Sequence, residues 1–107
     1  MAASGNRIRR KQKNNDFYKA ILLLQNEEEC YSFFRDVCTQ TELRAMEQRF
    51  EVARLLRLGY VYNKILERTG ASSATISRVA RSLDDSTGGY DSVLDRLDKH
   101  TDSAQRQ

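Results

Sequence analysis

The sequence predicts an all-α protein with a single small domain, on the basis of three observations. Its 107 residues include no proline, so no residue interrupts a helical run by removing a backbone donor. Hydrophobic residues make up 39% of the chain, and they recur at the three- and four-residue intervals that are typical of helices. A chain this short buries little interior by itself, so a second subunit would extend its core.

The two ends of the chain are expected to lie outside the folded domain. Residues 1–14 lack apolar periodicity and are expected to form a disordered basic arm. The basic residues of this arm are Arg7, Arg9, Arg10, Lys11 and Lys13. The helical domain is expected over 15–99, and the polar segment 100–107 is expected to be a frayed tail.

The first expected helix begins near Asn15 or Asp16 and contains the run from Leu22 to Leu24. Consecutive apolar residues cover the whole circumference of a helix, so this segment requires burial on every side. Asn26 is expected to cap a second helix, because the three glutamates after it suit the positive end of a helix dipole. The apolar side chains that this second helix is expected to bury are Cys30, Phe33, Phe34 and Val37.

A capping pair, Thr39 with Glu42 three positions later, is expected to open a long central helix. Apolar residues recur at helical spacing as far as Gly59, where this helix is expected to end. A last helix is expected over 90–99, after a polar loop that contains two glycines.

Residues 60–83 have the length and the turn signals of a helix-turn-helix. A short helix is expected to end at Gly70, and a second helix capped by Ser72 or Ser73 begins at once. The apolar residues that fall where these two helices pack together are Ile65, Ala71, Ile76 and Val79. The second helix is therefore a candidate recognition helix for the major groove of duplex DNA.

The other sides of this second helix present hydroxyl groups near its N-terminus, followed by two arginines. Hydroxyl groups there can donate to a phosphate, and arginines can reach phosphates or guanine edges. The DNA contacts predicted from this pattern are Ser72, Ser73, Thr75, Ser77, Arg78 and Arg81. An ordinary αα-hairpin without DNA binding is the alternative interpretation of the same segment.

The charge distribution favours a polyanionic partner that meets one part of the chain. Residues 39–83 contain eight Lys or Arg against four Glu, whereas residues 84–102 contain six Asp against two basic residues. A basic arm and a basic middle segment, with an acidic end, suit double-stranded DNA as the partner. The arm either lies along phosphates or in the minor groove, or it is a solvated tail.

Several other classes of function lack the residues that they need. The only histidine, His100, lies in the polar end segment, so no metal site is predicted. No Ser-His-Asp set and no glycine-rich phosphate loop occur, so we predict that the protein is not an enzyme. No apolar run approaches the length of a membrane span, and no signal peptide is predicted. We therefore expect a cytoplasmic protein whose thiols, Cys30 and Cys38, are reduced.

The segment from Cys38 to Leu83 resembles the bacterial Trp repressor family. The resemblance is carried by Thr39, Glu42, Leu43, Arg49, Leu55-Leu56-Arg57, Gly70-Ala71 and Ala74-Thr75-Ile76-Ser77-Arg78. With Glu28-Glu29-Cys30-Tyr31 and Phe33-Phe34 included, nearly the whole chain is similar to the Trp-repressor-like YerC/YecD group. The resemblance implies a transcriptional regulator with six helices per subunit, and an intertwined homodimer in which N-terminal helices pack into the partner.

The resemblance also implies an effector pocket between the central helix and the recognition helix. The positions that match the corepressor contacts of the family are Thr39, Arg49, Arg78 and Ser82. Val79 replaces the glycine that makes room for the indole, so tryptophan is not expected as a corepressor. No cofactor is predicted. We expect Arg49 in an ion pair rather than at a ligand, and Arg78 at the DNA.

One further pair of DNA contacts follows from the resemblance alone. The family residue that corresponds to Asn63 lies near bases or phosphates, which adds Asn63 and the neighbouring Lys64. The predicted function is sequence-specific DNA binding by a homodimeric repressor. The alternatives are a dimeric helical module that binds an acidic protein, and an amino-acid-responsive repressor with a ligand other than tryptophan.

Overall fold

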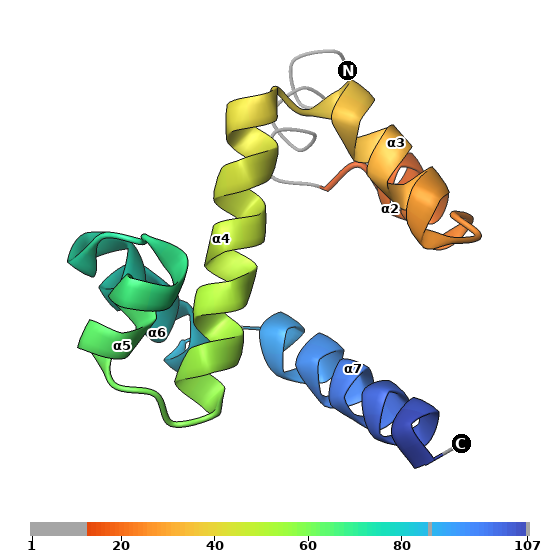
Figure 1. Cartoon of the computed structure of the whole chain (residues 1–107). Helices are drawn as coiled ribbons and strands as arrows, with labels where there is room; N and C mark the ends of the chain where they lie inside the picture. The colour runs from red at the N-terminus through yellow and green to blue at the C-terminus, as the bar shows by residue number, and fades with distance from the viewer. Residues whose placement is uncertain (1–12, 86, 107) are drawn as a thin grey trace. The chain divides into compact units, whose positions relative to one another are not determined.

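The computed structural model describes residues 13–85 and 87–106, with the backbone alone for 102–106. Within these residues the chain forms six helices and no strand, as predicted (Figure 1). The helices belong to two compact units, Met1–Thr39 and Gln40–Gln107. No helix of the described part is long and apolar enough to cross a membrane. The expected basic arm falls almost entirely on residues 1–12, which lie outside the described residues.

The first unit contains the helices α2 (Asn15–Leu22) and α3 (Glu27–Val37). Asn14 and Asn26 cap them, each accepting a hydrogen bond from the backbone N–H three residues further on, at 3.2 and 2.8 Å. An asparagine side chain at this position satisfies one of the N–H groups that lack a partner within the helix. The predicted start near Asn15 and the predicted cap at Asn26 are both confirmed.

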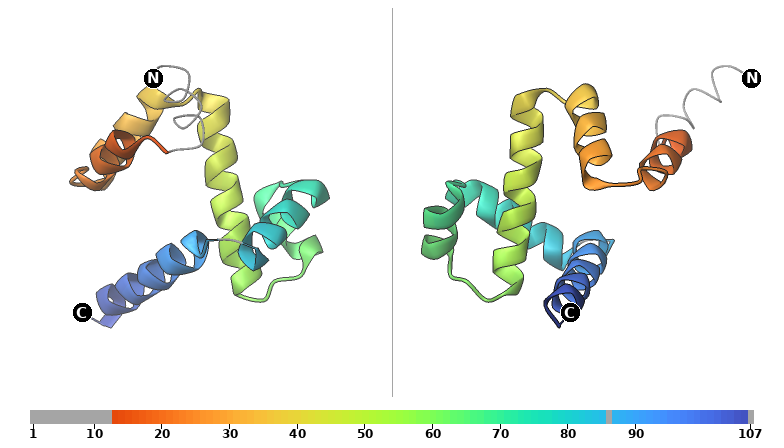
Figure 2. Two further views of the ribbon diagram at one scale, coloured as in Figure 1. Left: turned by 180° about the vertical axis from the view of Figure 1, so that it is seen from behind. Right: turned by 45° about the vertical axis from the view of Figure 1, so that its right-hand side comes forward.

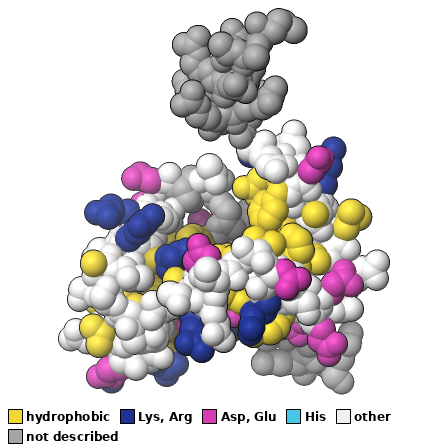
Figure 3. All heavy atoms as spheres, turned by 90° about the horizontal axis from the view of Figure 1, so that it is seen from above, with side chains coloured by type: hydrophobic (Ala, Val, Ile, Leu, Met, Phe, Trp, Pro, Cys, Tyr) yellow, Lys and Arg dark blue, Asp and Glu magenta, His cyan; other side chains and the backbone are white. Residues whose placement is uncertain are grey.

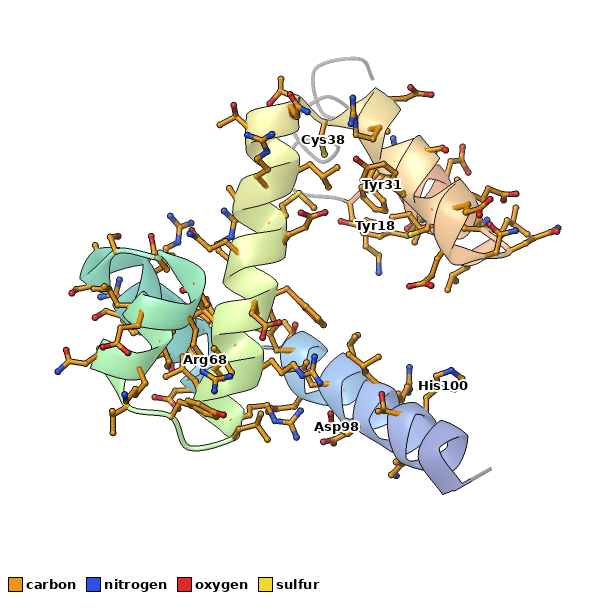
Figure 4. The ribbon with its side chains drawn as sticks, in the orientation of Figure 1. Tyr18, Tyr31, Cys38, Arg68, Asp98 and His100 are labelled. Carbon is orange, nitrogen blue, oxygen red and sulfur yellow. The ribbon has the colours of Figure 1, made fainter. Side chains whose placement is uncertain are left out.

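Neither α2 nor α3 buries a side chain completely. The Phe17 and Phe33 rings pack one helix against the other, with 6.1 Å between their centroids. The expectation that this helix contains the run from Leu22 to Leu24 is wrong, because α2 ends at Leu22 and Leu23 is its C-cap. Leu22 and Leu23 remain 84% and 74% exposed, although the sequence predicts burial on every side. Figure 4 labels two further exposed side chains of this unit, Tyr18 and Tyr31.

The side chains of α3 are likewise less enclosed than expected. Val37 is exposed, while Cys30, Phe33 and Phe34 are half-buried rather than buried. Helices of 8 and 11 residues are too small to cover each other's apolar faces. The expected burial is therefore absent from the single chain.

The second unit is built on α4 (Gln40–Arg57), which begins directly after Thr39, as the capping pair predicts. The helices α5 (Tyr62–Thr69) and α6 (Ser73–Asp84) lie on one side of α4 (Figure 2). The last helix, α7 (Gly89–Arg106), starts beside α4 and runs away from α5 and α6. The helix-turn-helix pair is thus held by the long helix α4.

The helix α7 is longer than the sequence predicts. The expected helix ends near Lys99 and the expected tail begins at His100, whereas α7 continues through Arg106. No glycine or proline follows Gly89, so no residue stops the helix there. Figure 4 places His100 on this helix.

The core of the second unit is apolar and joins all four of its helices. Its buried side chains are Val52, Ala53, Leu55, Ile65, Ala71, Ile76, Val79 and Leu94. The four residues predicted to pack the helix-turn-helix are all among them, which confirms that prediction. Full burial of a side chain such as Ile65 or Ile76 stabilises the fold by about 1.5–3 kcal/mol.

Candidate nucleic-acid interface

The turn between α5 and α6 depends on Gly70. Its φ of 73° lies in the left-handed region, which a residue with a side chain adopts only with strain. The Gly70 N–H donates to the Leu66 carbonyl oxygen at 2.8 Å and closes the end of α5. The predicted end of the helix at Gly70 is confirmed.

The helix α6, which is the candidate recognition helix, is capped by Ser72, one of the two predicted alternatives. Ser72 Oγ accepts a hydrogen bond from the Thr75 N–H at 3.1 Å, and the Ser72 hydroxyl donates to Thr75 Oγ1 at 3.1 Å. Thr75 is half-buried, and its hydroxyl group is hydrogen-bonded to Ser72 within the first turn of α6. Ser73, the first residue of the helix, keeps an exposed side chain.

The side of α6 away from the core carries a line of exposed residues. Ala74, Arg78 and Arg81 are exposed, and their spacing of four and three positions aligns them along the helix. Ile76 and Val79, on the other side, are 0% and 1% exposed. The arginines therefore project away from the packed face, as a recognition helix requires.

Ala74 is a candidate contact that the hydroxyl-and-arginine pattern does not identify. A small side chain lets the helix approach a groove closely, and a methyl group can contact the methyl group of thymine. Its spacing from Arg78 and Arg81 is the signal that could have found it. Ser77, which the pattern does identify, is half-buried beside the exposed line.

The helix α5 contributes the exposed residues Asn63 and Lys64. Lys64 Nζ lies 3.5 Å from Glu67 Oε2 in an exposed ion pair one turn along the helix. Such a pair contributes little free energy, so Lys64 can exchange this partner for a phosphate.

Arg68 is a second basic residue of α5, and sequence reasoning did not include it. Its guanidinium carbon lies 4.8 Å from the centroid of the Tyr60 ring, and Figure 4 labels the side chain. Stacking on an aromatic ring orients an arginine without neutralising it. On the one face that Figure 3 presents, basic and acidic side chains are interspersed with hydrophobic ones.

The four residues matched to an effector pocket are divided between the units. Thr39 belongs to the first unit, and Arg49, Arg78 and Ser82 belong to the second. Arg49 is half-buried on α4, whereas Arg78 and Ser82 are exposed on α6.

Ser82 lines an open hollow of about 500 Å³. The other lining residues are Phe50, Thr87, Gly89, Tyr90 and Val93, which makes the hollow largely apolar. Val79 is not among the lining residues, because its side chain is buried in the core. Among the described residues, no cluster of His, Cys, Asp and Glu side chains could hold a metal ion.

The helix α7 is attached to α4 through Arg57. The Arg57 side chain hydrogen-bonds to the Asp95 carboxylate, and Arg57 Nη1 donates to the Asp91 carbonyl oxygen at 3.3 Å. The hydrogen bond to Asp95 raises the pKa of Arg57 above its ordinary value, and the charges of Asp95, Asp91 and Asp98 act in the same direction. The charged guanidinium therefore attaches the aspartates at the start of α7 to the end of α4.

The helix pair α5 and α6, with its turn at Gly70 and the exposed face of α6, places this all-helical protein in the helix-turn-helix class. The chain belongs to the Trp repressor family, because the family model described as Trp repressor protein matches residues 12–98. Members of this family are DNA-binding regulators and not enzymes. The resemblance predicted from the sequence is thereby confirmed.

Three relatives illustrate this membership. A Bacillus subtilis (strain 168) protein, described as the uncharacterized protein YerC, is 46% identical over 93 residues, which are 86% of this chain and 89% of that protein. A crystal structure of a TrpR-like protein from Eubacterium eligens ATCC 27750 is 52% identical, with a TM-score of 0.75, over 78% of this chain and 86% of the other. The protein in a crystal structure from Staphylococcus aureus, described as a proposed Trp repressor, is 46% identical, with a TM-score of 0.76. The match covers 78% of this chain and 84% of the other.

Proposed function

We propose that this protein is a sequence-specific regulator of transcription that acts as a homodimer and uses α6 as its recognition helix. The observation that carries this proposal is the exposed line of Ala74, Arg78 and Arg81, opposite the buried Ile76 and Val79. Repression then follows from occlusion of a promoter by the bound dimer.

The proposed roles of the α6 side chains follow from their chemistry and exposure. Arg78 and Arg81 reach guanine edges or phosphates, and the Ser73 hydroxyl donates to a phosphate at the positive end of the helix. The remaining hydroxyl residues that we assign to this surface are Ser72, Thr75 and Ser77, which lie at its N-terminal edge and flank. On α5, Asn63 and Lys64 contact the phosphate backbone and set the register on the duplex.

The homodimer is supported by the apolar surface that the single chain leaves exposed. Leu22, the last residue of α2, and Leu23, its C-cap, are largely exposed, and Tyr31 and Val37 are half exposed on α3. A second copy that covers these side chains would supply the burial that two short helices cannot give each other. Two recognition helices would then enter successive major grooves, about 34 Å apart, on an approximately palindromic site.

A titration against duplex DNA tests this function directly. The purified protein is mixed with random genomic duplex fragments at two salt concentrations, and fragments retained at the higher salt are sequenced and measured by anisotropy. Selective retention of a common palindromic site supports the proposal. Binding that disappears uniformly with salt contradicts sequence specificity, because phosphate contacts alone produce that behaviour. No binding to any duplex favours instead the dimeric module for an acidic protein.

A ligand-responsive regulator is a second candidate, which is favoured by the hollow of about 500 Å³ beside Ser82. Of the positions matched to the effector contacts of the family, Ser82 lines this hollow, and Thr39, Arg49 and Arg78 do not. The test repeats the titration with each amino acid added in turn. A change in operator affinity with one of them other than tryptophan supports this candidate, and no change with any amino acid contradicts it.

A further inference from the structure

We propose that Gln48 is a positioning residue, which sets the orientation of α5 and α6 on α4 and thereby the DNA specificity of α6. This inference rests on the proposed function, since it concerns how the same helix meets DNA. Gln48 Nε2 on α4 donates a hydrogen bond to the Thr69 carbonyl oxygen at 3.1 Å. The two residues are 21 positions apart in the chain, so the bond joins separate elements of the fold.

The bond reaches α5 at the point where the helix-turn-helix bends. The carbonyl groups of the last helical turn lack partners within the helix, and Thr69 is the last residue of α5. The Thr69 hydroxyl donates to the Ile65 carbonyl oxygen at 2.7 Å and accepts from the Ala71 N–H at 3.1 Å. Thr69 therefore shapes the turn from within, while Gln48 ties the same residue to α4.

Apolar packing alone does not determine this orientation sharply. The buried contacts of Ile76 and Val79 with α4 are non-directional, so they tolerate small rotations of α6. A hydrogen bond imposes limits on distance and angle. Both Gln48 and Thr69 are half-buried, where competition from water is reduced.

The position of the turn between α5 and α6 affects binding to a specific DNA sequence more than binding to duplex DNA of any sequence. Ser73, the first residue of α6, follows Thr69 by only four positions, so a shift of the turn moves the end of α6 that enters the groove first. Hydrogen bonds to base edges require close placement, whereas phosphate contacts carry no sequence information. Loss of the Gln48 bond should therefore lower operator affinity and leave affinity for random duplex nearly unchanged.

Two substitutions separate the hydrogen bond from the space that the side chain fills. Gln48→Glu keeps the size but places a carboxylate oxygen against the Thr69 carbonyl oxygen, and Gln48→Met keeps the length without a donor. Gln40→Glu is the matched control, because it makes the same charge change at the exposed start of α4. Each variant is titrated with the selected operator and with random duplex.

We expect both Gln48 variants to lose about tenfold in operator affinity, which equals about 1.4 kcal/mol. The affinity of Gln48→Met for random duplex should equal that of the wild type, because both have the same net charge. The affinity of Gln48→Glu for random duplex should equal that of the Gln40→Glu control. In a selection with variable half-site spacing, the Gln48 variants should accept a wider range of spacings. Amide exchange at Gly70 and Ala71 should also be faster in Gln48→Met, which reports on the turn without DNA.

The outcomes distinguish this inference from the proposed function. A wild-type protein that selects an operator, together with Gln48 variants of unchanged selectivity, would overturn the inference alone. A wild-type protein without selectivity would overturn both. If Gln48→Glu does not fold, the uncharged Gln48→Met variant decides the matter by the same measurements.

Discussion

Arg57 on α4 and Asp91 on α7 form an ion pair, with 3.5 Å between Arg57 Nε and Asp91 Oδ1. The same guanidinium also pairs with the carboxylate of Asp95, one turn further along α7. Arg57 therefore attaches the first two turns of α7 to α4, in addition to the buried Leu94 of α7 in the apolar core. The rest of α7, as far as Arg106, extends beyond this attachment.

Replacement of this arginine should loosen α7 without unfolding the protein. In Arg57→Ala, amide exchange in the first two turns of α7 should become severalfold faster, because the ion pairs are lost. Global stability should change little, since the pairs are exposed to solvent. Arg44→Ala, the same charge change at an exposed position of α4, is the control and should leave α7 unaffected.

The pH dependence of this effect follows from the raised pKa of Arg57. A group with a raised pKa stabilises the fold fully below its ordinary pKa, and it loses that contribution only as the pH rises through the higher folded-state pKa, which for an arginine is strongly alkaline. The difference between wild type and Arg57→Ala should therefore be the same at neutral and at mildly alkaline pH. A difference that shrinks between those two conditions would contradict this assignment.

The core of the helix-turn-helix should be sensitive to lost volume. Ile76 is 0% exposed, so Ile76→Ala should lower the free energy of unfolding by about 2–5 kcal/mol through lost burial and a cavity. Denaturant titration followed by circular dichroism measures this value. Leu66→Ala, at a side chain that is 44% exposed, should cost less than about 1 kcal/mol. Equal losses in the two variants would contradict the assigned core.

The left-handed turn should resist a side chain at Gly70. A Cβ atom there would meet nothing within 4 Å, so the cost of Gly70→Ala comes from its φ of 73°. We expect the free energy of unfolding to fall by about 1–2 kcal/mol in a thermal or denaturant melt. Gly89→Ala also has open space but no positive φ, and it should be neutral or stabilising by up to about 1 kcal/mol.

Arg78 should contribute to DNA binding and not to folding. Arg78→Ala should weaken operator binding by about 1–3 kcal/mol if the guanidinium reads a base edge, and anisotropy titration measures this. The melting temperature should stay unchanged, because the side chain is exposed. Arg96→Ala, an exposed charge on α7, is the control. Unchanged operator affinity in Arg78→Ala would remove this residue from the interface.

The proposed dimer should depend on the exposed leucines at the C-terminal end of α2. Leu23 is 74% exposed in the single chain, and Leu23→Asp places a charge where the partner would cover an apolar surface. Sedimentation velocity should show a dimer for the wild type and a monomer for this variant. Gln25→Asp, at an exposed polar position nearby, should remain dimeric. A dimeric Leu23→Asp protein would mean that the interface lies elsewhere.

Local interactions explain which features the sequence could predict. Asn26 and Ser72 cap their helices through N–H groups three residues away, and Gly70 ends α5 through its own backbone freedom. The inward positions of α6 follow from helical periodicity, so Ile76 and Val79 were predicted to be buried without knowledge of their neighbours. None of these interactions depends on residues distant in the chain.

Other features require the tertiary structure. Gln48 meets Thr69 across 21 positions, and no local pattern marks either residue as a partner of the other. Ala74 is apolar like a core residue, yet it shares a helix face with Arg78 and Arg81, and the structure shows that this face is exposed. Leu22 and Leu23 show the opposite case, since their apolar run predicts burial that the single chain does not provide.

The sequence by itself thus determined where the helices begin, two of their caps, the turn at Gly70 and the membership in a family of DNA-binding regulators. These depend on hydrogen bonds and periodicity within a few residues, or on residue types in a motif. Only the tertiary structure decided how α4 holds the turn through Gln48 and holds α7 through Arg57. Such contacts form only after the apolar core has brought distant segments together, so no short stretch of the sequence predicts which residues pair.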